Sequence, residues 1–264
     1  MKDFLKLWYM SLKMIFKTWA EYRADFVIGI VAMFVANITS MVYFWVVFQN
    51  ITSLNGWSFG QILFLSGMLS LSNGISHTFL SGVSPWSVEE YVRSGELDRI
   101  LLKPVGTLRY FLISSIDEDG FGEIGASILI IFTGASLSGI IWNVQTIGLF
   151  LLFAISGALI IFSIFLFFSS LAFWTTRIHS LSDAVFSLMK FVRYPLEIYN
   201  PFIIFFLSFV VPLAFVNYYP AEMFFGKGSY FYFAYITPLI GITMLVLSKL
   251  FWNFSIKHYT STGS

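Results

Sequence analysis

Long apolar runs separated by short polar ones dominate this chain. A helix that crosses a bilayer needs about 20 mainly apolar residues, and six stretches are suitable. They are Phe26–Phe48, Ile62–Val83, Ile124–Trp142, Ile147–Trp174, Phe202–Val216 and Phe231–Phe251. The fifth is short, and the fourth is long enough to tilt or to project from the bilayer. The pattern predicts an all-α integral membrane protein with six transmembrane helices in one domain, residues 1–264.

Composition supports a bilayer environment. Of the residues, 58% are hydrophobic and 11% are charged, and the mean hydropathy is +0.81. An average soluble domain carries about 25% charged residues, so this chain cannot cover itself with a solvated surface. Aromatic residues make up 20% of the chain, which suits a lipid-facing surface. The net charge of +1 gives no general attraction to nucleic acid.

The basic residues set the expected orientation. Lysine and arginine stay on the cytoplasmic side of membrane proteins. If the N-terminus is cytoplasmic, every one of the 15 lysines and arginines except Lys227 falls on that side. The sequence therefore predicts cytoplasmic N- and C-termini.

The segment before the first predicted span, residues 2–21, is amphipathic. One face at 100° per residue is apolar: Phe4, Leu5, Trp8, Leu12, Ile15, Phe16 and Trp19. The opposite face carries Lys2, Lys6, Lys13 and Lys17. This pattern predicts a helix lying in the headgroup plane, with membrane lipid as its partner. A plain membrane anchor is the simplest role for it.

A polar loop of about 40 residues, 84–123, joins the second and third predicted spans, and loops of that length are often functional. Ser87 and Glu90, just after Pro85, form a capping-box pattern, and Gly95 is a suitable helix stop. A second short helix should end at Lys103–Pro104. The expected apolar stripes are Val88, Tyr91 and Val92 on the first helix and Leu97, Ile100 and Leu101 on the second. Helices this short are not stable alone in water, so they should dock on something.

The predicted outer loops are small. Gln49–Gln61 and Asn143–Thr146 carry almost no charge, and the last, residues 217–228, is apolar and broken by Pro220. The last loop is expected to be a re-entrant or interfacial segment.

Sequence signatures of catalysis are absent. There is no Walker A motif, dinucleotide-binding glycine fingerprint or HExxH. His77, His179 and His258 have no metal-ligand spacing, so no metal site is predicted. The acidic groups Glu89–Glu90 and Asp117–Asp119 could bind a cation, but a solvated charge run is the commoner explanation.

A few polar residues lie inside the predicted spans, among them Asn37, Asn73 and His77. Asn73 and His77 are four apart and share a helix face. Hydrogen bonding between helices explains them without a substrate; the alternative is that Asn37, Asn73 and His77 line a translocation path. No carboxylate is expected at mid-depth, although ion-driven carriers usually keep an ionisable group there.

Three stretches resemble a known family. The run Arg93–Pro104, RSGELDRILLKP, resembles the G-x-L-D-x-x-L-x-K-P signature of a bacterial group of ATP-binding-cassette (ABC) permeases of the type-2 exporter class. Phe191–Tyr199 and Pro212–Ala221 resemble the same group. Together with the six-span layout, the resemblance covers nearly the whole chain.

The resemblance implies an inner-membrane permease that forms a dimer with an identical or related chain and binds two copies of a separate ATPase subunit. ATP and Mg would be bound there, and this chain would bind no cofactor and catalyse no reaction. A cytoplasmic coupling helix between spans two and three would contact the ATPase. The residues implied for that coupling are Val88, Glu89, Glu90, Tyr91, Val92, Arg93, Gly95, Leu97, Asp98, Arg99, Ile100 and Leu101. The apolar ones would supply contact area, with Tyr91 and Arg93 as the main anchors.

The leading function is thus the transmembrane permease subunit of an ABC transporter. It would be an exporter that works by alternating access. An ATP-independent channel or secondary carrier is the alternative, and the long capped loop and missing mid-depth carboxylate argue against it. A membrane-embedded enzyme should show a cluster of His, Asp or Glu at one membrane face, and none is evident in the sequence. Small apolar outer loops favour a lipid, hydrophobic drug or peptide as substrate over a sugar delivered by a binding protein.

Overall fold

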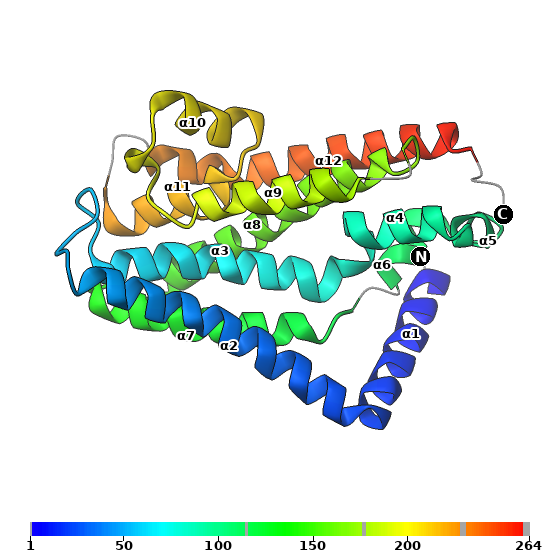
Figure 1. Cartoon of the computed structure of the whole chain (residues 1–264), viewed down its shortest axis with the longest axis horizontal. Coiled ribbons are helices and arrows are strands. Elements are labelled where there is room, and N and C mark those ends of the chain that lie inside the picture. Colours follow the sequence, from blue (N-terminus) through cyan, green and yellow to red (C-terminus); the bar gives the residue numbers. More distant parts are fainter. Residues whose placement is uncertain (1, 114–115, 176–177, 228–230, 261–264) are drawn as a thin grey trace.

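The computed structural model describes residues 2–113, 116–175, 178–227 and 231–260, with side chains from Lys6 onward. Over these ranges the protein is helical, with one isolated bridge between Leu54 and Trp57. The long helices run side by side along the longest axis of the molecule (Figure 1). They are α2 (Arg23–Phe48), α3 (Phe59–Leu80), α7 (Asp119–Leu137), α8 (Val144–Leu171), α9 (His179–Phe191) and α12 (Thr237–Ser255).

Shorter elements gather at the two ends of the bundle (Figure 1). One end holds both chain termini and the short helices of the polar loop: the 3-10 turn η1 (Ser81–Val83), α4 (Pro85–Arg93), α5 (Glu96–Leu101) and α6 (Thr107–Ile113). The other end holds α10 (Pro201–Phe205), the π-helical turn η3 (Phe206–Val210) and α11 (Ala214–Phe225). The remaining 3-10 turns are η2 (Leu196–Ile198), η4 (Phe231–Ile236) and η5 (Ile256–His258). The termini and the polar loop therefore share one end, as the predicted topology requires.

Helix α3 forms the centre of the bundle and packs most closely on α7. Gly60, Gly67 and Gly74, spaced by seven residues, all face α7. Across the contact, a Cβ added to Gly134 would lie 2.5 Å from the Phe64 backbone nitrogen and 2.7 Å from the Gly60 carbonyl oxygen. Only glycine fits there, because the obstructing atoms are backbone. Small residues that allow such close approach are typical of helix pairs in membranes.

Four helical segments are long and apolar enough to cross a membrane: α2, α7, α8 and the run Phe231–His258 that contains α12. The pair Pro201–Val210 and Ala214–Phe225 also qualifies when it is taken as one segment, which gives five. Helix α3 matches the second predicted span and is 22 residues long, but its serines, glycines, Asn73 and His77 lower its hydropathy. Because most of α3 is buried inside the bundle, its own surface does not need to be lipid-compatible.

The fifth predicted span is wrong as a continuous helix. The chain is helical from Pro201 to Val210, breaks around Pro212, and continues as α11 at an angle of 109°. Val211 is extended, with φ −122° and ψ 89°, as the residue before a proline prefers. The expected outer segment 217–228 lies mostly in the buried helix α11, and its last residue is outside the described residues.

Of two further helices, α1 was predicted from the sequence and α9 was not. Helix α1 occupies Lys2–Glu21, the range predicted for the amphipathic segment, and the exposed side chains on it include Trp8 and Phe16. The predicted face residues Lys2, Phe4 and Leu5 lie outside the described side chains. Helix α9 was not predicted, because its serines, His179, Asp183 and Lys190 interrupt the apolar pattern.

Candidate functional site

A cavity of about 530 Å³ opens beside the polar loop, where α3, η1, α4 and α7 meet. Its polar lining comes mainly from α3 and from the residues that lead into α7, and its apolar lining includes Trp86, Phe165 and Phe186. Two of the sequence candidates, Asn73 and His77, line it. The cavity therefore joins the interior of the bundle to the end that holds α4 and α5.

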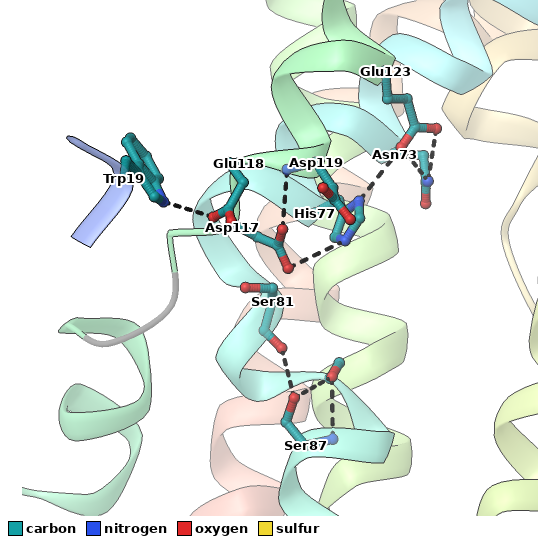
Figure 2. A network of polar contacts seen from close by, with 10 residues as sticks. Trp19, Asn73, His77, Ser81, Ser87, Asp117, Glu118, Asp119 and Glu123 are labelled. Carbon is teal, nitrogen blue, oxygen red and sulfur yellow. Dashed lines mark hydrogen bonds and ion pairs between the residues drawn. The ribbon is translucent and has the colours of Figure 1, made fainter. Parts of the chain in front are cut away.

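Glu123 and Asp117 hold the two α3 side chains in this cavity (Figure 2). Asn73 Nδ2 donates to both carboxylate oxygens of Glu123, at 2.9 and 3.1 Å. His77 lies with Nδ1 3.7 Å from Glu123 Oε2 and Nε2 3.5 Å from Asp117 Oδ2. When the imidazole is protonated, both contacts are ion pairs. Glu123 is only 5% exposed, so these contacts supply the partners that a buried carboxylate needs.

The segment that leads into α7 is fixed by further hydrogen bonds. The Asp117 backbone N–H donates to the Thr78 carbonyl at 2.9 Å, and Asp117 Oδ1 accepts from the Asp119 backbone N–H at 3.1 Å. Burial alone would raise the pKa of the Asp117 carboxyl, but hydrogen bonds and charge from His77 outweigh it and hold that pKa below its usual value. Trp19 Nε1 donates to Glu118 Oε2 at 2.7 Å, which ties α1 to the same segment (Figure 2).

This geometry corrects the interpretation of the acidic residues. The run Asp117–Asp119 is not a solvated charge run, because Asp117 and Glu118 hold side chains of α3 and α1. Glu123 belongs to the buried part of α7 and not to a loop. Among the described residues, no three His, Asp, Glu or Cys side chains are placed to hold a metal ion.

The three candidates for a translocation path do not come together. Asn73 and His77 share the cavity, whereas Asn37 is absent from its lining. Asn37 Nδ2 donates to the Met33 carbonyl of its own helix at 3.0 Å. The contacts of Asn73 and His77 with α7 are the helix-to-helix hydrogen bonds that explain polar residues in a bundle.

Helices α4 and α5 are joined by a turn at Gly95, and we call this pair the hairpin. The start of the hairpin differs from the prediction. The N-cap is Ser84, whose Oγ accepts from the Ser87 backbone N–H at 3.3 Å, and Pro85 is the first helical residue. Ser87 Oγ contacts Ser84 Oγ at 2.8 Å and donates to the Ser81 carbonyl at 3.3 Å (Figure 2). The predicted capping box of Ser87 and Glu90 is therefore wrong: the serine three residues earlier caps the helix.

The turn between α4 and α5 agrees with the prediction. Gly95 has φ +74°, a left-handed conformation that glycine adopts without steric cost. It lies two residues after Arg93, the last residue of α4, and directly before Glu96, the first residue of α5. The second helix ends at Leu101, just before Lys103–Pro104.

Most of the apolar stripe on the hairpin faces inward. Val88, Val92, Leu97 and Ile100 are each at most 3% exposed and join a cluster that includes Phe162 and Trp252. The prediction that these four residues supply contact area to a partner is wrong, because the protein's own core covers them. Tyr91 is half-buried, with its ring 5.2 Å from that of Phe111.

The outward rim of the hairpin is charged, and it becomes apolar at the C-terminal end of α5. Its exposed residues are Glu90, Arg93, Ser94, Glu96, Arg99, Leu101 and Leu102. Arg93 pairs with Glu90 on the same helix, and Leu102 is 87% exposed. Asp98 is half-buried. Glu89 turns toward the bundle, where its Oε2 accepts from the Ile178 backbone N–H at 2.9 Å.

A chain of aromatic rings connects the hairpin to the last helix. Tyr91 contacts Phe111 of α6, and Phe111 contacts Trp252 of α12 at 5.8 Å between centroids. Trp252 in turn contacts Phe173 at 4.8 Å. Phe111 and Trp252 are at most 1% exposed. These buried contacts link the hairpin to α12 without a break, and packed interiors transmit strain.

The protein combines several apolar helices of membrane-crossing length with a hairpin whose apolar side is buried in the bundle. These features define a multi-pass helical membrane protein. The chain belongs to the ABC-2 transporter family: the family model described as ABC-2 family transporter protein matches residues 34–263. No curated protein and no solved structure matches the chain.

Proposed function

We propose that this chain is the transmembrane permease subunit of an ABC exporter, driven by ATP hydrolysis on a separate subunit. Membership in the ABC-2 family supports this function, since such permeases usually work with an ATPase subunit. The hairpin α4–α5 carries the proposal: its apolar side is fixed in the protein core, and its charged rim is free of that core.

In the proposed mechanism, the ATPase docks on the rim of the hairpin. Closure of two ATPase subunits pushes two hairpins, one from each permease chain of a dimer. The push reaches the bundle by three contacts: Glu89 with Ile178, Phe111 with Trp252, and His77 with Asp117. A path between the two permease chains then opens alternately to either side of the membrane. The dimer partner is an identical or a related chain.

The proposed topology places the hairpin end in the cytoplasm and makes α3 a sixth span. The positions of both termini and of α4, α5 and α6 at one end support it (Figure 1), as do the basic residues Arg93, Arg99 and Arg109 there. Helix α1 would lie flat at the cytoplasmic leaflet, with the exposed Trp8 and Phe16 toward lipid.

One observation favours a second function, an ATP-independent secondary carrier. Glu123 is a carboxylate buried within a membrane-length helix beside His77, and ion-driven carriers use such groups. A carrier would move substrate without any ATPase and would respond to Glu123→Gln more strongly than to changes on the hairpin rim.

Charge reversal on the rim tests the docking proposal. Arg99→Glu should abolish co-purification of the ATPase, because a rim charge sets register against a partner and its reversal creates repulsion. Arg99 is exposed, so the fold should persist. The matched control is Lys257→Glu, the same charge change at another exposed position, in the turn η5 that follows α12. Equal recovery of the ATPase with both variants would contradict docking at the rim.

A further inference from the structure

The end of the bundle opposite the hairpin contains a second cavity, of about 630 Å³. It lies between η2, the broken pair α10–η3 and α11, and η4. Its lining combines two carboxylates, Glu197 and Glu222, with the aromatic rings of Phe205, Phe209 and Phe233. Tyr218 and Tyr219 also line it. Cavities of this volume are large enough for a drug-sized ligand. We name it the outer acidic pocket.

Glu222 is the unusual residue in this pocket. Its side chain is 1% exposed, and its Oε1 accepts from the Tyr218 hydroxyl at 2.8 Å. Its Oε2 is buried and has no hydrogen-bond partner among the described residues. A buried carboxylate oxygen without a partner is costly unless a cation or a proton satisfies it.

The protein's own cations do not fill this role. Among the described residues, no lysine or arginine nitrogen lies within salt-bridge distance of Glu197 or Glu222. The basic residue nearest to Glu222 in the sequence is Lys227, whose Nζ donates to Gln61 Oε1 at 2.7 Å and to the Gly56 carbonyl. It also stands 5.3 Å from the ring centre of Trp57. Lys227 is thus held on the loop before α3, where it is close enough to Glu197 to interact with its charge, but it forms no salt bridge with either carboxylate.

Glu197 is placed differently from Glu222. It is exposed, and its Oε1 accepts from Trp57 Nε1 at 3.2 Å. Glu197 therefore lies at the mouth of the pocket and Glu222 at its base. Tyr218, on α11, packs its ring 6.0 Å from that of Trp57 in the loop before α3. Aromatic rings also attract cations through their negative faces.

We propose that the outer acidic pocket binds an amphipathic cation, a positively charged nitrogen on an apolar body, as a substrate on its way out of the membrane. The nitrogen sits between Glu197 and Glu222, and the apolar body packs on Phe205, Phe209 and Phe233. This inference rests on the proposed export function and names its substrate class. The ligand chemistry fits a soluble hydrophobic amine or the headgroup of an aminolipid.

The test measures binding to the purified chain in non-ionic detergent, without any ATPase. The probes are rhodamine 6G, a hydrophobic cation, and Nile red, a neutral dye, followed by fluorescence anisotropy. Glu222→Gln should raise the Kd for rhodamine 6G at least about tenfold and leave Nile red unchanged, because a lost charge pair is worth at least 1.4 kcal/mol, or tenfold. Glu21→Gln, a substitution of an exposed acid on α1, is the matched control and should bind as the wild type does.

Glu197→Gln guards against a folding defect, because its side chain is exposed, and it should weaken rhodamine 6G binding in the same direction. Competition by phosphatidylethanolamine but not by phosphatidylglycerol would identify an aminolipid; binding without competition would identify a soluble amine. If both glutamine variants bind rhodamine 6G like the wild type, the inference is wrong. That result would leave the proposed function intact, since ATPase co-purification is a separate measurement.

Discussion

Gly134→Val should lower the melting temperature of the detergent-purified protein by roughly 5–10 °C. The added side chain would meet the Phe64 nitrogen and the Gly60 carbonyl, at 2.5 and 2.7 Å from its Cβ. Neither atom can move away by a rotamer change, so α3 and α7 must separate. Overpacking of this kind costs about 1–3 kcal/mol, and more where backbone must shift.

Gly148→Val is the control for this substitution. Gly148 lies in α8, another long apolar helix, but nothing lies within 4 Å of a Cβ placed there. Both variants add the same β-branched side chain to a helix, so their difference isolates the α3–α7 contact. Equal melting temperatures for the two variants would show that these helices do not approach as closely as described.

The second large effect is expected from Phe111→Ala. Phe111 is 0% exposed and lies between Tyr91 of the hairpin and Trp252 of α12. Truncation of a buried phenylalanine costs about 3–5 kcal/mol. The loss should fall on the attachment of the hairpin, since Phe111 is the ring through which Tyr91 reaches α12.

Limited proteolysis measures this attachment. Trypsin should cut at Arg93, Arg99 or Arg109 roughly a hundredfold faster in Phe111→Ala, because about 3 kcal/mol corresponds to that change in the open population. Phe202→Ala removes a ring that is 74% exposed and should leave the cleavage rate unchanged. A hairpin that is cut equally fast in both variants would be held by other contacts.

Several features could be predicted because they depend on local chemistry. The turn at Gly95 follows from glycine's freedom at positive φ, and α5 ends before Lys103–Pro104 as expected. The range of α1 coincides with the amphipathic segment. The apolar runs predict α2 and α8 to within three residues at each end, and α7 and α12 to within six.

Other features could not be predicted, because they depend on which helices pack against each other in the folded protein. Periodicity placed Val88 and Val92 on an apolar stripe of one short helix and Leu97 and Ile100 on a stripe of the next, but it could not tell whether the protein's own core or a partner covers them. The same limit hid the contact of Glu123 with Asn73, residues 50 apart in the sequence. Two sequence signals could have predicted more. The seven-residue spacing of Gly60, Gly67 and Gly74 indicates a close helix contact, and Pro212 within an apolar run indicates the break before α11.

Nucleotide dependence is the most direct test of the central claim. The chain would be purified alone and together with an ABC ATPase subunit from the same genome, and ATP binding and hydrolysis would be measured in liposomes. The account predicts no saturable ATP binding by the isolated chain. It also predicts that hydrolysis requires the ATPase subunit and that the wild-type permease changes the hydrolysis rate. The Arg99→Glu permease should leave that rate unchanged. Saturable ATP binding by the isolated chain, or ATPase activity indifferent to the permease, would contradict the account.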